Sequence, residues 1–319
     1  MIERVVPMNN KLTLTGANKL FFAFTVVFML YQLLAGIFFG EALLDNVYVL
    51  LVINQALIAS FVLIYCIVKK INIKETFRFK KLDLLPAILI VLLAVPAMLV
   101  ASMLNNILVY FLQFIMDVPA STLPVPKTVS ELAVGILLIG VLPGVCEELM
   151  HRGFLLKAYE RRGSYKAVVI VAILFGLFHF DITNLLGPIF LGLLIGYYVV
   201  RTGSIFAGML AHFMNNTIAQ LIQFMFADQE PAEYIRLSLQ ELIGIIGLGI
   251  VSLVVVAGLL YLFKKVTEGK AEIVPPISRT RDDVRAVITH WPIIAVIAMY
   301  VLWTLFYILV SIASRYLPF

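Results

Sequence analysis

Six polar or charged residues lie in stretches that otherwise consist mainly of apolar side chains. They are Glu147, Glu148, Arg152, His179, His212 and Asn216. An ionisable side chain near the centre of a bilayer costs roughly 2.5–3.5 kcal/mol on insertion scales, so such residues usually face a protein interior or a water-filled cavity. Carboxylates and imidazoles are also the groups that most often transfer protons in catalysis. The residue types therefore predict a site for acid–base chemistry inside a membrane protein.

The two acids of this set have different predicted environments. On a helix Glu148 lies four residues before Arg152 and shares its face, whereas Glu147 points about 100° away. We expect Glu148 and Arg152 to form a buried ion pair that supports the site. Glu147 is then left without a partner. An unpaired carboxylate in apolar surroundings binds a proton more readily, which suits a general base at neutral pH.

His179 is expected at the same depth in the membrane as Glu147. Glu147 lies about sixteen residues before a turn predicted at Gly163, and His179 lies about sixteen residues after it. Each is then roughly 24 Å along its helix from the turn, so His179 could share a water molecule with Glu147. His212 and Asn216 are four residues apart on a later helix and could donate hydrogen bonds to a developing oxyanion.

These residues resemble the three motifs of the CAAX protease and bacteriocin-processing (CPBP or Abi) family, which are EExxxR, FxxxH and HxxxN. The motifs occur here in that order and begin at Glu147, Phe175 and His212. The resemblance covers about residues 135–225 and implies an intramembrane glutamate-dependent endopeptidase. It implies that Glu147 and His179 activate a water molecule, and that His212 and Asn216 stabilise the tetrahedral intermediate. The other two residues of the first motif would be structural support.

Other chemistries use some of the same residues. His151 lies four residues after Glu147 and could pair with it or reach the cytoplasmic surface. Cys146 directly precedes Glu147, but adjacent helix positions do not face each other and no partner base is evident, which disfavours a thiol mechanism. The acids and histidines could also ligate a metal, yet the chain has no H-E-x-x-H motif. We expect neither a metal nor another cofactor.

Several polar residues outside the motifs are expected to be structural. His290, at the start of the last apolar stretch, is expected to be a hydrogen-bonded core residue. Amides in the apolar stretches are expected to join helices without a catalytic role. They are Asn105, Asn106, Gln220 and Gln223. Cys66 and Cys146 both lie in apolar runs, which indicates buried, reduced thiols.

The composition indicates a polytopic membrane protein. Hydrophobic residues make up 62% of the chain and charged residues 13%, against roughly 45–50% and 25% in soluble domains. The net charge of +5 comes from basic residues that cluster between apolar stretches. Membrane orientation explains such clusters, so we do not expect nucleic-acid binding.

Stretches of about 20 apolar residues can cross a hydrocarbon core of roughly 30 Å. The sequence predicts them near 20–40, 47–68, 84–115, 133–156, 166–182, 186–200, 204–226, 240–263 and 291–314. The third could be broken at Pro96 and the sixth is short, so about eight or nine transmembrane helices are expected. The predicted fold is an all-α, polytopic integral membrane bundle. The first stretch is too long for a cleaved signal sequence and is expected to remain as a helix.

Basic residues define the expected orientation. Three connectors carry most of them: Lys69, Lys70, Lys74, Arg78, Lys80 and Lys81; Lys157, Arg161, Arg162 and Lys166; Lys264, Lys265, Lys270, Arg279, Arg281 and Arg285. By the positive-inside rule, these connectors and the N-terminus, which contains Arg4, should be cytoplasmic. We divide the chain into N-terminal transmembrane helices (1–130), a catalytic core (131–227) and C-terminal transmembrane helices (228–319).

The expected function is hydrolysis of a peptide bond by an integral cell-membrane endopeptidase that uses Glu/His-activated water. The expected partners are the lipid bilayer and a peptide or a lipidated, membrane-tethered protein substrate. Two other classes stay open. One is a non-catalytic scaffold or bacteriocin-immunity factor of the same fold, which would bind a partner in the cavity. The other is a proton-coupled transporter, because buried acid–histidine sets also form proton relays.

Overall fold

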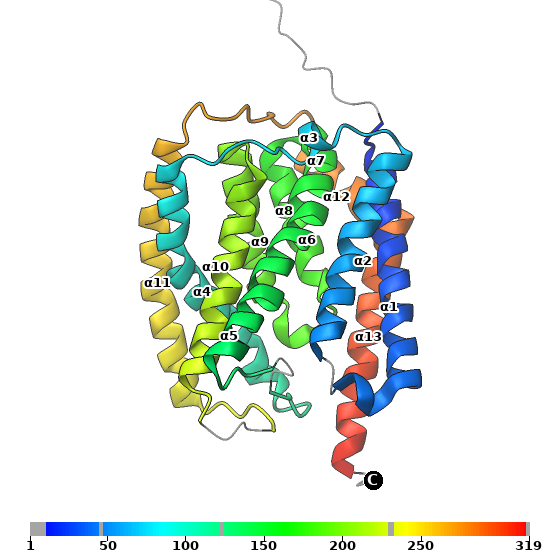
Figure 1. Cartoon of the computed structure of the whole chain (residues 1–319), viewed down its shortest axis with the longest axis vertical. Helices are drawn as coiled ribbons and strands as arrows, with labels where there is room; N and C mark the ends of the chain where they lie inside the picture. The colour runs from blue at the N-terminus through cyan, green and yellow to red at the C-terminus, as the bar shows by residue number, and fades with distance from the viewer. Residues whose placement is uncertain (1–10, 45–46, 121–123, 229–232, 317–319) are drawn as a thin grey trace, which may run out of the picture.

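The computed structural model describes residues 11–44, 47–120, 124–228 and 233–316. Arg4 lies outside these residues. The described chain is 80% helical and has no strands (Figure 1). In order, the helices are α1 (Leu14–Leu44), α2 (Val47–Val68), α3 (Ile73–Thr76), α4 (Leu84–Leu112), α5 (Val129–Gly135), α6 (Leu142–Glu148), α7 (Leu156–Tyr159), α8 (Ser164–Phe178), α9 (Leu186–Thr202), α10 (Ile205–Met225), α11 (Leu239–Val266), α12 (Thr280–Ile288) and α13 (Trp291–Tyr316). The all-α prediction is confirmed.

Helices occur at each predicted membrane span. Among the described residues, 6 helical stretches are long and apolar enough to cross a membrane. They are Leu14–Phe38, Val47–Val68, Leu84–Leu112, Val129–Arg162, Leu239–Val266 and Trp291–Ser314. The other three predicted spans coincide with α8 and α9, which are shorter apolar helices, and with α10, which carries several amides and a histidine. The prediction of a polytopic helical membrane protein is therefore confirmed.

The outer surface of the bundle is apolar. Large hydrophobic side chains point outward along the long helices, for example Val254 on α11, which is 69% exposed, and Leu302 on α13, which is 66% exposed. A soluble monomer rarely exposes contiguous apolar area of this extent, because water disfavours it. Lipid is the solvent that this surface requires.

Helix α4 is continuous through Pro96. The sequence allowed a break there, but the structure has one helix of 29 residues with Pro96 inside it. Proline is tolerated inside membrane helices because neighbouring helices and local adjustments compensate for the missing hydrogen bond. Helices α9, α10 and α11 all pack against α4. This continuity lets α4 form one long wall of the bundle.

The three basic connectors meet at one end of the bundle, which we call the basic end. Lys80 donates to the carbonyl of Lys270 (3.0 Å), and Ser164 N donates to the carbonyl of Val274 (3.0 Å). Helices α3, α7 and α12 lie together at this end (Figure 1). The structure therefore supports the expectation that these connectors share one face, as the positive-inside rule requires.

Asp283 on α12 connects the segments of the basic end through buried hydrogen bonds. Its carboxylate, 1% exposed, accepts hydrogen bonds from Arg162 (2.5 Å), Lys166 (2.5 Å) and Ser278 (2.6 Å). Burial raises the pKa of Asp283, but these three hydrogen bonds outweigh burial and lower it to about 2. The ionised carboxylate therefore joins the start of α8 to α12.

The bundle contains two large apolar clusters, with the motif residues at their boundary. One cluster is formed mainly by α1, α2, α6 to α8 and α13, with a few residues of α9 and α10, and the other is formed by α4, α9, α10 and α11. Helix α10 packs against α6 from the first group and against α4 and α9 from the second. Helix α6 carries the two glutamates of the first motif and α10 carries the third motif. Packing of α10 therefore brings the two motifs together.

Candidate active site

The two glutamates lie on an irregular helix. The sequence predicted a regular helix over 133–156, but α6 is flanked by π-helical segments, Ile136–Val141 and Leu149–Leu155. Glu147 and Glu148 are the last residues of α6 and are 8% and 0% exposed. A π-helical turn widens the helix, changes the direction of the side chains that follow and is frequent at functional sites. The spacing of a regular α-helix therefore predicts the directions of these side chains only approximately.

Glu148 forms the expected ion pair with Arg152. Arg152 Nη1 donates to Glu148 Oε1 (2.7 Å), and both side chains are almost completely buried. The guanidinium also donates to the carbonyl of Gly192 on α9 (3.3 Å) and lies 4.4 Å from the centre of the Phe175 ring. The pair therefore connects α6, α8 and α9 through buried contacts.

His212 lies between the two carboxylates. Its Nδ1 is 3.0 Å from Glu148 Oε1, and its Nε2 is 3.9 Å from Glu147 Oε2. Because an ionised carboxylate only accepts hydrogen bonds, Nδ1 of His212 carries the proton toward Glu148. The Nε2 edge then faces Glu147. Both glutamates thus meet one imidazole, although they are adjacent in sequence.

Glu147 is not the unpartnered carboxylate that the sequence predicted. Gln55 Nε2, from α2, donates to Glu147 Oε1 (2.9 Å). The other oxygen, Oε2, is buried without a hydrogen bond among the described residues. Sequence reasoning missed Gln55, whose signal was an amide within the apolar stretch 47–68. One oxygen of Glu147 is therefore fixed, and the other remains available on the side of His212.

His179 caps the C-terminal end of α8. Its Nδ1 donates to the carbonyl of Phe175 (2.8 Å), so Nε2 of the neutral ring holds a lone pair. The next residue, Phe180, has a φ of 48°, a conformation that bulky residues rarely adopt, and the chain turns sharply there. No hydrogen bond or ion pair joins His179 to Glu147 in the part of the chain that the structure describes.

His151 occupies neither of its two expected positions. It is 0% exposed, so it does not reach the cytoplasmic surface. Its Nδ1 donates to the backbone carbonyl of Glu147 (2.9 Å) and not to the carboxylate. The ring packs edge-on against Phe175 and Phe178, with ring centres 4.9 and 4.8 Å away. The two aromatic residues of α8 therefore hold His151 as a packing residue behind the site.

Asn216 lies one turn beyond His212 on α10. One of its amide hydrogens is donated from Nδ2 to the carbonyl of Ile139 (2.8 Å), in the first π-helical segment. Its Oδ1 accepts from Asn215 Nδ2 (3.2 Å). A primary amide has two hydrogens, so Asn216 retains a second donor after bonding to Ile139.

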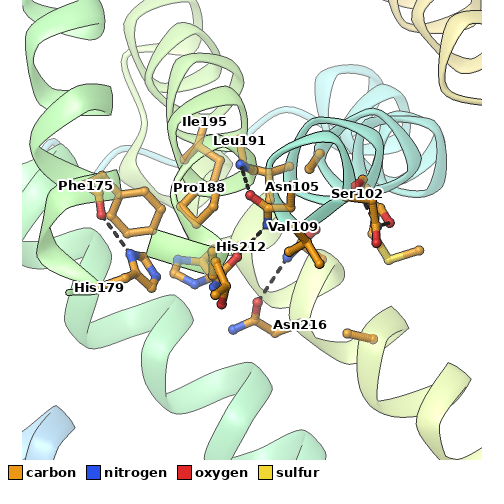
Figure 2. A pocket seen from close by; sticks show the side chains of 18 of the residues that line it. Ser102, Asn105, Val109, Phe175, His179, Pro188, Leu191, Ile195, His212 and Asn216 are labelled. Carbon is orange, nitrogen blue, oxygen red and sulfur yellow. Dashed lines mark hydrogen bonds between the residues drawn. The ribbon is translucent and has the colours of Figure 1, made fainter. Parts of the chain in front are cut away.

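A cavity of about 540 Å³ opens beside these residues (Figure 2). Figure 2 shows His179, His212 and Asn216 around it, with the Phe175 ring next to both imidazoles. The cavity is lined by Met98, Ala101, Ser102, Asn105, Asn106, Val109, Phe175, His179, Thr183, Asn184, Gly187, Pro188, Leu191, Ile195, His212, Asn215, Asn216, Ala219 and Ile235. We call this space the catalytic cavity. Glu147 and Glu148 do not line it and lie behind His212.

Two amides that were expected to join helices without a catalytic role, Asn105 and Asn106, lie beside the candidate site. Both line the catalytic cavity. Asn105 also donates to Asn184 (2.7 Å) and accepts from the backbone N–H of Gly187 (2.7 Å), so it fixes the start of α9. An amide in the apolar stretch 84–115 has the same sequence signature in a helix contact as beside a cavity, so the sequence did not indicate that they line one. Gln220, by contrast, bonds to Gln223 (2.7 Å), and His290 bonds to Asn18 (2.8 Å), as structural residues do.

The site residues do not form an evident metal centre. Among the described residues, no group of three or more histidine, cysteine, aspartate or glutamate side chains is arranged to hold a metal ion. Cys66 and Cys146 are buried free thiols, as predicted. The chemistry that the described side chains themselves offer is proton transfer and hydrogen-bond donation, from two acids, two imidazoles and an amide.

Comparison with known proteins identifies the segment that carries this site. Residues 129–218 match the family model described as type II CAAX prenyl endopeptidase Rce1-like. The match confirms the resemblance to the CAAX protease family, covers less than a third of the chain and includes all three motifs. No curated protein and no solved structure matches the chain. At the family level, the match supports a membrane-embedded protease.

Proposed function

We propose that this chain, whose residues 129–218 are Rce1-like, is an intramembrane endopeptidase that hydrolyses a peptide bond with a water molecule activated by Glu147. The observation that carries the proposal is the position of His212. This one imidazole contacts Glu148, faces Glu147 and lines the catalytic cavity. It thereby connects a buried pair of acids to a space that a peptide can occupy.

Glu147 is the general base. Its Oε1 is held by Gln55, and its Oε2 is directed toward Nε2 of His212. In the proposed reaction, a water molecule from the catalytic cavity passes His212 to reach Oε2, which removes a proton from it. His179 orients this water, because its Nε2 accepts a hydrogen bond while Nδ1 stays bonded to the carbonyl of Phe175. General base catalysis of this kind contributes typically about 10²–10⁴-fold to the rate.

His212 and Asn216 stabilise the negative charge that follows. Attack of the water oxygen on the peptide carbonyl carbon converts the carbonyl oxygen to an oxyanion. Protonated His212 donates from Nε2 to this oxyanion while Nδ1 stays bonded to Glu148, and Asn216 donates its second amide hydrogen. Preorganised donors of this kind act mainly on the transition state, where the charge develops. The proton held by Glu147 then passes to the peptide nitrogen as the C–N bond breaks, which releases an amine and a carboxylic acid, and the acid then gives its proton to the regenerated Glu147 carboxylate or to the amine.

The substrate is a peptide or protein that is associated with the membrane. The site lies within helices that are expected to be surrounded by lipid, and the matched family model describes endopeptidases that act on prenyl-bearing CAAX proteins. A substrate segment must therefore enter the catalytic cavity from the bilayer or from its edge. We propose a membrane-tethered substrate, with or without a prenyl group.

The test is cleavage of a panel of membrane-tethered and lipidated peptides by purified wild type and His212→Ala. The expected result is a kcat about 10²-fold lower in His212→Ala with little change in KM, because the oxyanion exists only after attack. Glu268→Gln removes an exposed carboxylate at the basic end and should match wild type. An effect of His212→Ala on KM alone, or equal turnover by the two enzymes, would contradict the assigned role.

A further inference from the structure

A second cavity adjoins the catalytic cavity. It has a volume of about 630 Å³ and lies between the turn after α8, helix α13 and the segments around 119 and 235. Its lining residues are Pro119, Ala120, Phe180, Asp181, Ile182, Thr183, Asn184, Ile235, Trp303, Thr304 and Tyr307. We call it the outer cavity. The function described above uses none of the residues that line only this cavity.

The two cavities share a wall. Thr183, Asn184 and Ile235 line both of them. Two backbone hydrogen bonds hold the segments beside this wall together, from Ala120 N to the carbonyl of Glu233 (3.0 Å) and from Ile235 N to the carbonyl of Val118 (2.7 Å). A peptide whose scissile bond lies near His179 can therefore place a neighbouring residue in the outer cavity.

One carboxylate and three aromatic rings dominate the outer cavity. Among the described residues that line it, Asp181 is the only charged one. Its Oδ1 accepts from the N–H and the hydroxyl of Thr183 (2.8 and 2.7 Å), whereas its Oδ2 has no hydrogen bond or ion pair within the described residues. The rings belong to Phe180, Trp303 and Tyr307. A carboxylate beside aromatic faces is a typical arrangement for an ammonium or guanidinium group, which both attract.

The backbone fixes the position of this carboxylate. Phe180, directly before Asp181, has a φ of 48°, and its ring packs against Tyr300 with a centroid distance of 5.8 Å. The hydrogen bonds from Thr183 hold the Asp181 side chain in one orientation. Strained backbone of this kind persists where the surrounding structure requires it, and functional sites are common examples. Here the strain places His179 in one cavity and Asp181 in the other.

Charges at this end of the bundle also favour a cation. The end lies opposite the basic end (Figure 1). Among the residues whose side chains the structure describes, the acidic ones at this end are Asp117, Glu131, Asp181, Asp228, Glu233 and Glu241, and the basic ones are Lys127 and Arg236. Asp117 is paired with Arg236. A cationic group is therefore attracted to this end and repelled by the basic end.

We infer that the outer cavity is a specificity subsite that binds a cationic group of the substrate near the scissile bond, with Asp181 as its counter-ion. The group is a lysine or arginine side chain or an N-terminal ammonium. The inference rests on the proposed endopeptidase function. It also means that the substrate segment next to the cleaved bond approaches from the end opposite the basic end.

Trp303 provides a binding readout that needs no cleavage. The chain has 2 tryptophans, so Trp291→Phe leaves Trp303 alone. We expect N-acetylarginine amide to change the Trp303 fluorescence saturably, and the neutral isostere N-acetylcitrulline amide to have no effect. Asp181→Asn keeps an oxygen for the Thr183 hydrogen bonds and should weaken binding at least about tenfold. Glu233→Gln removes an exposed carboxylate at the same end, outside the cavity, and should bind like its parent.

The probes also distinguish the three cationic groups. Nα-acetyl-lysine amide, titrated in the same way, tests binding of a side-chain ammonium. Glycinamide tests binding of an N-terminal ammonium. Equal responses of Asp181→Asn and its parent, or equal responses to the charged and neutral probes, would overturn the subsite.

Cleavage separates this inference from the proposed function. Pairs of membrane-tethered peptides that differ only by lysine or norleucine are compared, with this residue moved along the peptide from pair to pair. At one position, the enzyme should cleave the lysine peptide about tenfold faster than the norleucine peptide. Asp181→Asn should lose this preference, and Glu233→Gln should keep it. Cleavage without any such preference would overturn the subsite and leave the endopeptidase proposal intact. Binding of the cationic probes without cleavage of any peptide would overturn the endopeptidase proposal instead.

Discussion

Replacement of Arg152 by methionine should destabilise the protein strongly. Methionine keeps most of the apolar volume but removes the guanidinium, which bonds to Glu148 (2.7 Å) and to the carbonyl of Gly192 (3.3 Å) and lies over Phe175. Glu148, 0% exposed, then keeps only His212 as a partner among the described residues. Removing one member of a buried ion pair costs about 3–5 kcal/mol, because the other charge stays buried. We expect a loss of about 4 kcal/mol in the free energy of unfolding.

The double variant Glu148→Gln/Arg152→Met isolates the pair. In the double variant neither the carboxylate nor the guanidinium is present, and the introduced glutamine still accepts a hydrogen bond from His212. About 2 kcal/mol of the unfolding free energy lost in Arg152→Met should therefore be recovered. The assay is equilibrium unfolding in mixed micelles, followed for wild type, both single variants and the double variant. Lys265→Met is the matched control. Within the described residues, the exposed ammonium of Lys265 contacts only the Tyr261 ring (4.6 Å). Its replacement should lower the free energy of unfolding by less than about 1 kcal/mol.

Two results would refute this reasoning. One is a loss below about 1 kcal/mol in Arg152→Met, the range of an exposed ion pair. The other is a double variant whose loss equals the sum of the two single losses, since additivity means that the residues do not interact.

Three further outcomes follow from the contacts around the site and the basic end. Gln55→Leu removes the donor to Glu147 Oε1 and should lower kcat about tenfold with KM unchanged; a change in KM alone would count against the contact. Gly208→Ala places a Cβ 2.6 Å from Glu148 Oε2 and should lower kcat at least about tenfold by displacing this carboxylate from His212, whereas Gly258→Ala meets nothing within 4 Å and should be neutral. Asp283→Asn should cost about 2 kcal/mol of stability at pH 7. Because the pKa of Asp283 is lowered to about 2, this difference should persist above about pH 4 and disappear as the pH falls toward 2, and a difference that instead grew at low pH would contradict the assignment.

The membrane fold could be predicted from the sequence because lipid imposes a simple pattern. Long apolar stretches predicted a helix at each membrane span but not the short helices α3 and α12 in the connectors, and the basic connectors do meet at one end. The continuity of α4 at Pro96 could not be predicted, because proline breaks isolated helices and the packing of α9, α10 and α11 compensates here.

The candidate site was predictable in its residue types but not in its pairings. The Glu148–Arg152 pair follows from helical spacing and is observed. The convergence of Glu147 and Glu148 on His212 depends on the π-helical turns beside α6 and on how α10 packs, which no local pattern specifies. Gln55 was missed because an amide in an apolar stretch has the same sequence signature in a helix contact as in a site, and for the same reason the sequence did not indicate that Asn105 lines the cavity.

The most direct test of the account is the turnover of the membrane-tethered peptide panel by wild type and Glu147→Gln, each checked for an intact fold. Glutamine keeps the shape of the side chain and an oxygen for the Gln55 hydrogen bond but cannot act as a general base. The account predicts that wild type cleaves at least one peptide and that Glu147→Gln is slower by about 10²–10⁴-fold. Equal turnover by a folded Glu147→Gln variant would contradict the central claim that Glu147 activates the attacking water.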